Sequence, residues 1–182
     1  MTVPNLITTI RIILTPVFVI YIINDELISA LFVLVISGLS DGVDGMVARL
    51  FNQKSKLGSY LDPLADKIIL ISAFISLSIR GFLPSWLTVM VISRDVLILM
   101  GVSILFLTGM KIDIRPKVSS KVTTCLQFLT VILVLSKDYL SSLEGFYPYL
   151  FYLTALFTII SFLQYMHQWF NLTGGSKDAN QG

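Results

Sequence analysis

Four aspartates in two pairs are the residues of this sequence best suited to chemistry. Asp41 and Asp44 are three positions apart in SDGVDGMVARL, and Asp62 and Asp66 are four apart shortly afterwards. Helical residues three or four apart share a face, so each pair predicts a helix with two carboxylates on one side. The connection between these helices is short, which predicts antiparallel neighbours and brings four carboxylates together.

Converging carboxylates need a counter-charge, because bare ones would repel one another strongly. Oxygen ligands without His or Cys select Mg²⁺, Mn²⁺ or Ca²⁺ over zinc, and two divalent ions on shared carboxylates suit phosphoryl chemistry. On the face of Asp41, the small residues Gly45 and Ala48 leave room for a ligand. Arg49 at the edge of that face suits a phosphate oxygen. The alternative is a set of structural ion pairs, with the small residues serving helix packing.

The elements that must position these residues are strongly apolar. The chain has 182 residues, 55% of them hydrophobic and 13% charged, and its mean hydropathy is +0.84. Soluble domains average about 25% charged residues, and a bilayer span takes about 20 mostly apolar residues. Six windows qualify and predict an all-α integral membrane protein with six transmembrane helices: residues 5–24, 27–50, 61–80, 84–108, 119–137 and 147–170.

Lysine and arginine are concentrated in alternate connections between these windows. Cytoplasmic segments are enriched in these residues. Both termini are therefore predicted to be cytoplasmic, in an inner (cytoplasmic) membrane, with the active site facing the cytoplasm. Residues 1–171 are predicted to form one transmembrane domain, and residues 172–182 a disordered cytoplasmic tail. The net charge of only +2 argues against a nucleic-acid partner.

A membrane transporter is the alternative from another class of protein, with buried carboxylates lining a permeation path. Transporter sites tend to lie near the bilayer midplane, between structural repeats. Here the acidic cluster lies toward one end of its helices, beside a basic loop, and the sequence has no apparent internal repeat. These features favour an enzyme.

The stretch DGVDGMVARLFNQKSKLGSYLDPLAD resembles the signature of the CDP-alcohol phosphatidyltransferase family, D-x2-D-G-x2-A-R-x8-G-x3-D-x3-D. All eight fixed positions match: Asp41, Asp44, Gly45, Ala48, Arg49, Gly58, Asp62 and Asp66. The opening VPNLITTIRIILTP is similar to the family's usual P-N-x-x-T-x-x-R, through Pro4, Asn5, Thr8 and Arg11. The resemblance extends to about residue 170.

This resemblance implies a homodimeric membrane enzyme with the six-helix CDP-alcohol phosphotransferase fold. Such an enzyme transfers a phosphatidyl group from CDP-diacylglycerol to an alcohol and releases CMP. Two divalent cations, Mg²⁺ or Mn²⁺, would be held by Asp41, Asp44, Asp62 and Asp66. Asp66 would also be the catalytic base for the acceptor hydroxyl. The residues implied to contact the CDP nucleotide are Asp41, Gly45, Ala48, Arg49, Gly58, Asn5 and Thr8.

Basic residues farther along the chain bear on the acceptor alcohol. Arg94 and Asp95 lie inside the fourth window, where a charge pair marks either a functional site or a structural ion pair. Arg115, Lys117 and Lys121 surround the start of the fifth window, where they suit an acceptor with a phosphate or anchoring to anionic lipid. The residues assigned to acceptor binding are Lys121, Arg94, Arg115 and Lys117. A polar stripe on the fifth window is expected to face the active site: Lys121, Thr124 and Gln127.

The acceptor is expected to be an anionic lipid or glycerol 3-phosphate. The stretches ISRDV and SSKVTTCLQ look most similar to the family's cardiolipin synthases, whose acceptor is phosphatidylglycerol. The phosphatidylglycerophosphate synthases, which use glycerol 3-phosphate, typically have G-K-x-K-T where this chain has SKVTT, and Arg-Glu where it has Arg94-Asp95. A dianionic acceptor should need the second lysine more than a lipid phosphodiester does. Phosphatidylglycerol is therefore the expected acceptor, and glycerol 3-phosphate is the alternative.

Overall fold

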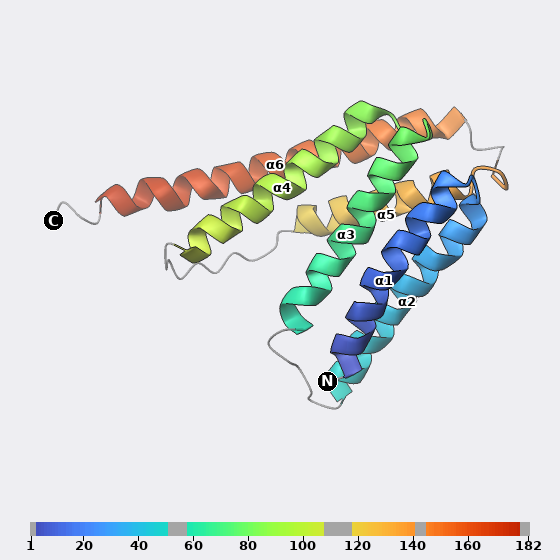
Figure 1. Ribbon diagram of the computed structural model, residues 1–182. Coiled ribbons are helices and arrows are strands. Elements are labelled where there is room, and N and C mark those ends of the chain that lie inside the picture. Colours follow the sequence, from blue (N-terminus) through green and yellow to red (C-terminus); the bar gives the residue numbers. More distant parts are fainter. Residues whose placement is uncertain (1–2, 51–57, 108–117, 141–144, 179–182) are drawn as a thin grey trace. The chain divides into compact units, whose positions relative to one another are not determined.

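The computed structural model describes residues 3–50, 58–107, 118–140 and 145–178, and the regular elements in these ranges are helical. Side chains are described for residues 11–38, 66–101, 118–140 and 145–169. The helices are α1 (Val3–Ile23), α2 (Leu27–Leu50), α3 (Gly58–Ile79), α4 (Ser85–Leu107), α5 (Val118–Leu135) and α6 (Tyr147–Asp178) (Figure 1). Each predicted window holds one of these helices. The all-α prediction with six helices is therefore confirmed for the described part of the chain.

Most helix limits lie within a few residues of the predicted windows. The window 27–50 coincides with α2, whereas α3 begins at Gly58, before the predicted start at residue 61. The largest difference is at the carboxyl end, where α6 continues to Asp178. Helical backbone thus continues past residue 171, and the division there into a domain and a tail stays a prediction.

Tertiary contacts divide the chain into two compact units. Unit 1 comprises Met1–Ser85 and Val131–Glu144, and unit 2 comprises Trp86–Thr130 and Gly145–Gly182. Within unit 1, α1 packs against both α2 and α3. Apolar side chains from all three helices are buried in this unit, among them Phe18, Ile22, Ala30, Leu34, Ile69, Leu70, Ala73, Phe74 and Leu77.

The helices α1 and α3 run parallel and end in the same way (Figure 1). Asp25 after α1 has φ 61°, and Gly81 after α3 has φ 76°. In each case the amide of the next residue donates to the carbonyl five positions earlier, at 2.9 Å after α1 and 2.8 Å after α3. This is the Schellman arrangement, in which a left-handed residue lets the last carbonyls find donors.

Two ion pairs join α1 to α3 and fix their register. Nη1 of Arg11 lies 2.6 Å from Oδ1 of Asp66, and Nε of Arg80 lies 3.1 Å from Oδ1 of Asp25. The partners are 55 residues apart in both pairs. One register of the two parallel helices therefore satisfies both pairs, some 20 Å apart along the helix axis at 1.5 Å per residue.

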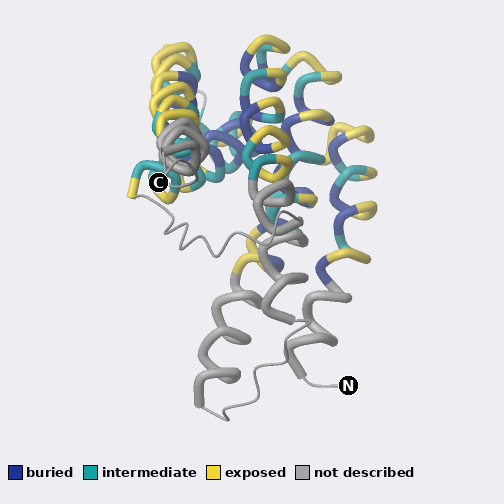
Figure 2. Tube along the Cα trace, turned by 90° about the vertical axis from the view of Figure 1, so that its left-hand side faces the viewer, coloured by how far each residue is buried: buried dark blue, intermediate teal, exposed yellow. Residues whose placement is uncertain are grey.

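Unit 2 buries polar side chains and exposes apolar ones. Arg94, Asp95 and Gln127 are buried together with several serines and threonines, whereas leucines and isoleucines of α4 and α6 are exposed. Figure 2 shows buried and exposed faces along the described helices. In water, so much exposed apolar surface would be unfavourable, but lipid covers it at little cost while hydroxyl groups bond between helices. The distribution is typical of helices in a membrane.

Two helices are long and apolar enough to cross a membrane, judged on the described residues. They are Val118–Leu135, with a mean hydropathy of 1.7, and Tyr147–Trp169, with a mean hydropathy of 1.5. Shorter apolar segments occur at Arg11–Ile23 and Leu27–Gly38. The prediction of membrane helices is thus supported for two of the six windows, and the other four spans stay predictions.

Alanine substitutions at two glycines test how much the left-handed residue after α3 contributes to stability. A Cβ added at Gly38, inside α2, or at Gly81 would meet no atom within 4 Å, so neither substitution creates a clash. We expect Gly38→Ala to stabilise the protein by about 0.5–1 kcal/mol, because alanine favours the helix. We expect Gly81→Ala to destabilise it by about 1–2 kcal/mol, because an L-residue is strained at positive φ. Thermal unfolding in detergent measures both, and shifts of the same sign would contradict this account.

Candidate active site

The four aspartates lie on two helices that both pack against α1. Asp41 and Asp44 are in the second half of α2, and Asp62 and Asp66 are in the first half of α3. Because α2 and α3 run in opposite directions, these halves lie at the same end of unit 1 (Figure 1). The side chains of Asp41, Asp44 and Asp62 lie outside the described set. The backbone places the four positions at one end of unit 1, and the convergence of the carboxylates stays a prediction.

Asp66 is the one aspartate of the four whose side chain is described, and it forms an ion pair with α1. Its Oδ1 accepts a hydrogen bond from Nη1 of Arg11 at 2.6 Å. The Arg11 side chain is only 3% exposed, whereas that of Asp66 is 40% exposed. A buried cation thus holds a carboxylate that a ligand can still reach.

The sequence predicts no role for Arg11. Two signals could have singled it out: its place in the P-N-x-x-T-x-x-R opening, and its position as a charged residue inside the predicted window 5–24. No local pattern relates residues 55 positions apart. Their contact follows from the register of α1 on α3, which the sequence does not reveal.

The residues predicted to contact the nucleotide lie on the same three helices. Asn5 and Thr8 are in the first half of α1, and Gly58 begins α3. The second half of α2 carries the others: Asp41, Gly45, Ala48 and Arg49. Their side chains lie outside the described set, so the nucleotide contacts stay predictions.

A metal site is compatible with the types of donor at this end of unit 1. The side chains that the structure describes contain no group of three or more His, Cys, Asp or Glu that could hold a metal, but only Asp66 of the four predicted ligands belongs to them. Carboxylates alone are the donors that Mg²⁺ and Mn²⁺ prefer. The exposed carboxylate of Asp66 fits such an ion, and the complete set of ligands stays a prediction.

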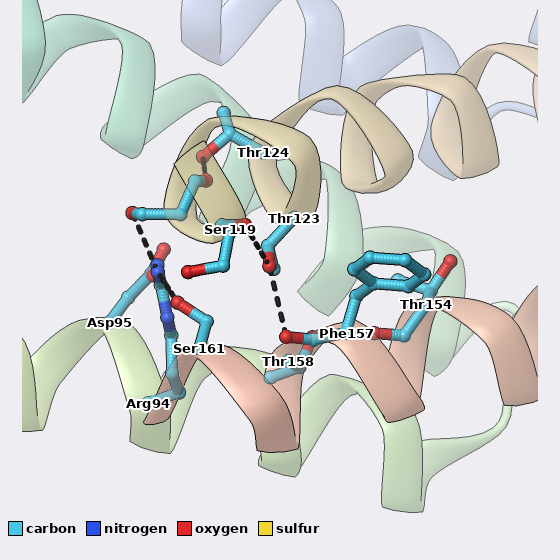
Figure 3. A network of polar contacts seen from close by, with 10 residues as sticks. Arg94, Asp95, Ser119, Thr123, Thr124, Thr154, Phe157, Thr158 and Ser161 are labelled. Atoms are coloured by element: carbon cyan, nitrogen blue, oxygen red, sulfur yellow. Dashed lines mark hydrogen bonds and ion pairs between the residues drawn. The ribbon is translucent and has the colours of Figure 1, made fainter. Parts of the chain in front are cut away.

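In unit 2, a buried charge pair joins α4 to α5 and α6 (Figure 3). Arg94 is 4% exposed and Asp95 is 2% exposed. Nη1 of Arg94 donates to Oδ1 of Asp95 at 2.6 Å, and Nη2 donates to Ser120 at 2.8 Å and to Ser161 at 2.6 Å. The guanidinium carbon also lies 5.8 Å from the centre of the Tyr165 ring. These contacts support the structural ion pair, and an acceptor contact by Arg94 stays a prediction.

Polar contacts continue along the interface of α5 with α6 (Figure 3). Because the contact partners have rising numbers on one helix and falling numbers on the other, the helices are antiparallel. Three contacts mark the interface: Ser119 donates to Gln164 at 2.6 Å, Thr123 donates to the Phe157 carbonyl at 3.0 Å, and the hydroxyls of Thr130 and Thr154 are 2.8 Å apart.

The predicted polar stripe on α5 does not form a single surface. Lys121 is exposed, Thr124 is half-buried and Gln127 is fully buried. Each step of three residues falls short of a full helical turn by about 60°, so the stripe crosses about a third of the circumference. Neither polar atom of the Gln127 amide has a hydrogen-bond partner among the described residues. Lys121 is the member that an external ligand can reach.

The other two residues assigned to the acceptor cannot be placed. Arg115 and Lys117 lie outside the described residues, in the segment between α4 and α5. Lys121 is therefore the one cation assigned to the acceptor whose side chain is both described and exposed.

The sequence of residues 1–165 matches the family model described as CDP-alcohol phosphatidyltransferase. The chain therefore belongs to the CDP-alcohol phosphatidyltransferase family, a family of membrane-embedded enzymes that are generally metal-dependent. The resemblance seen in the aspartate motif is confirmed by this match.

Particular relatives agree with this assignment. The protein of Rattus norvegicus named cardiolipin synthase (CMP-forming) is 34% identical over 183 residues, which cover 91% of this chain and 61% of that relative. A Streptomyces coelicolor protein of the same name is 39% identical over 58% of this chain and 52% of its own length. A CDP-diacylglycerol–glycerol-3-phosphate 3-phosphatidyltransferase of Aquifex aeolicus is 30% identical over 74% of this chain and 75% of its own length. The chain thus spans about three fifths of the rat relative.

The buried pair at Arg94 should be costly to break from one side. We expect Arg94→Met to destabilise the protein by about 3–5 kcal/mol, because the Asp95 carboxylate stays buried without its cation. Removing both charges in Arg94→Met/Asp95→Leu should restore much of this loss. Chemical or thermal unfolding in detergent provides the measurement.

A matched control is Thr124→Val, which removes a hydroxyl that bonds within α5, to the Ser120 carbonyl. Its cost should be about 1 kcal/mol or less. A cost for Arg94→Met no larger than that of the control would contradict the role of the buried pair.

Proposed function

We propose that this chain transfers the phosphatidyl group of CDP-diacylglycerol to phosphatidylglycerol, forming cardiolipin and releasing CMP. The observation that carries the proposal is the complete match of Asp41–Asp66 to the family signature, on the two helices that pack against α1. Support for the choice of acceptor comes from relatives named cardiolipin synthase, one of which aligns over 91% of the chain.

In the proposed reaction, the acceptor hydroxyl attacks the phosphorus that carries diacylglycerol. A new P–O bond forms, the bond from that phosphorus to CMP breaks, and CMP leaves with the electron pair. Asp66 accepts the hydroxyl proton, since an aspartate within hydrogen-bond reach is a suitable general base. Its partial exposure supports this role. The proposed metal ligands are Asp41, Asp44, Asp62 and Asp66, and the ions they bind would neutralise charge on the two phosphates.

The substrate contacts are assigned by the same proposal. Arg49 contacts the phosphates of CDP-diacylglycerol, and the absence of large side chains at Gly45 and Ala48 leaves room for the nucleotide. The remaining nucleotide contacts are Asp41, Asn5, Thr8 and Gly58. On the acceptor side, Lys121 contacts the phosphate, with contributions from Arg115, Lys117 and Arg94.

The start of α5 supports a singly charged acceptor phosphate. Lys121 is the only cation within Val118–Leu135. Thr123, which stands where glycerol 3-phosphate enzymes typically have a second lysine, is fully buried and bonds to the Phe157 carbonyl. A phosphodiester in a lipid has one negative charge, whereas a phosphate monoester has close to two at neutral pH.

Glycerol 3-phosphate is the second candidate acceptor, and its product would be phosphatidylglycerol phosphate. The Aquifex aeolicus relative favours it, because that protein is named for this acceptor and aligns over three quarters of its own length.

The proposal includes the setting of the enzyme. Six membrane spans, cytoplasmic termini and an active site at the cytoplasmic face would let the nucleotide enter from water while acyl chains remain in lipid. The proposed assembly is a homodimer, as the family resemblance implies. The excess of Lys and Arg in the predicted cytoplasmic segments supports this orientation.

A reconstitution assay tests the function. Purified protein in detergent receives CDP-diacylglycerol and Mn²⁺ with either phosphatidylglycerol or glycerol 3-phosphate, and CMP and lipid product are measured. We expect CMP and cardiolipin with phosphatidylglycerol, and a loss of turnover of at least about 10²-fold in Asp66→Asn, which removes the base. Product with glycerol 3-phosphate alone would overturn the choice of acceptor. No CMP with either alcohol would overturn the function.

Lys121 provides a separate test of the acceptor site. We expect Lys121→Ala to raise the KM for the acceptor by roughly tenfold and to leave the KM for CDP-diacylglycerol nearly unchanged, because a charge-assisted contact to one phosphate is lost. Lys137→Ala is the control, since Lys137 lies over the Phe82 ring in unit 1. A selective rise in the KM for CDP-diacylglycerol would contradict this assignment of Lys121.

A further inference from the structure

The two side chains that form the Arg11–Asp66 ion pair differ in how far they are exposed to solvent. An ion pair that only held two helices together would not need this difference. The Arg11 side chain is 3% exposed and the Asp66 side chain is 40% exposed, although Nη1 of Arg11 and Oδ1 of Asp66 are only 2.6 Å apart. Burial of a cation beside apolar helices is expensive. Here the buried cation holds the residue proposed as catalytic base.

A second ion pair also holds α1 against α3, and it lies away from the candidate active site. Arg80 and Asp25 are also 55 residues apart and join the other ends of α1 and α3. Both partners of this pair are substantially exposed. Alignment of the two helices thus does not depend on Arg11 alone, and the chain provides its own reference pair.

We infer that Arg11 is a positioning residue for the Asp66 carboxylate, an inference that rests on the proposed function. The terminal torsion of an aspartate is soft, so a free carboxylate samples many orientations. A charge-assisted hydrogen bond at 2.6 Å fixes one oxygen and hence the plane of the group.

Arginine suits this role better than lysine does. A guanidinium carries hydrogen-bond donors and no acceptor atom, so Arg11 cannot take the proton that Asp66 is proposed to receive. Its planar set of donors also fixes direction, whereas an ammonium group is a point charge. The pair therefore combines a permanent charge with a defined geometry.

Substitution of Arg11 is expected to have opposite effects on turnover and on metal binding. A guanidinium and a divalent ion on the same carboxylate repel each other. Removing Arg11 should therefore tighten metal binding, while the orientation of the carboxylate toward the acceptor loses the hydrogen bond at 2.6 Å that helps to fix it. Loss of a merely structural contact would weaken both.

The experiment compares Arg11→Gln and Arg11→Lys with Arg80→Gln in the full chain. Turnover is measured as CMP release, and Mn²⁺ affinity is measured separately by electron paramagnetic resonance without substrate. We expect Arg11→Gln to lower kcat by roughly 10–100-fold and to bind Mn²⁺ at least about tenfold more tightly. Arg80→Gln should leave both within about twofold, because an exposed ion pair contributes little.

Arg11→Lys separates charge from geometry. It should return Mn²⁺ affinity to within about threefold of the unmodified protein but leave kcat reduced, because charge is kept and the planar fork is lost. An unchanged kcat in Arg11→Gln, or a fall in kcat together with weaker Mn²⁺ binding, would overturn the inference. If Arg11→Gln does not fold, Arg11→Lys carries the test, and an unchanged kcat in that variant would overturn it.

The two proposals can fail separately. The unmodified protein tests the proposed function by CMP release alone. If it releases none, Mn²⁺ affinity still decides the inference about Arg11: tighter binding in Arg11→Gln supports the electrostatic coupling to Asp66, and unchanged binding overturns it.

Discussion

A charge beside lipid needs an opposite charge within its own helix bundle, and this constraint governs the arrangement of both units. Arg11 in unit 1 and Arg94 in unit 2 are nearly fully buried, and each has a carboxylate oxygen at 2.6 Å. Serine and threonine hydroxyls satisfy further donors and acceptors between α4, α5 and α6. Apolar side chains can then face outward, where they would be unfavourable in water.

The helices could be predicted from the sequence because apolar runs and the breaks between them are local signals. The window 27–50 coincides with α2, and the breaks contain residues such as Asp25 and Gly81 that adopt positive φ. The end of α6 was less predictable, because its last residues are polar and resemble a tail, yet the helix continues to Asp178. Composition alone does not show where such a polar helix ends.

The type of chemistry at the candidate site could be predicted from the sequence, but the contacts between its side chains could not. The spacing of Asp41, Asp44, Asp62 and Asp66 indicates the chemistry, since no other aspartates or glutamates in the sequence are three or four positions apart. It does not identify Arg11 as the partner of Asp66, nor Ser120 and Ser161 as the partners of Arg94. Those pairings depend on how distant helices are aligned, which local periodicity does not encode.

The equal spacing of the two ion pairs restricts how α1 and α3 can change. Between Arg11 and Asp25 there are as many residues as between Asp66 and Arg80, because both pairs have the same separation of 55. One inserted residue would turn part of a helix by about 100°, so one of the pairs would lose its partner unless the other helix gained a residue too. Both pairs are therefore kept only by insertions or deletions of equal length in α1 and α3, between the residues that form them.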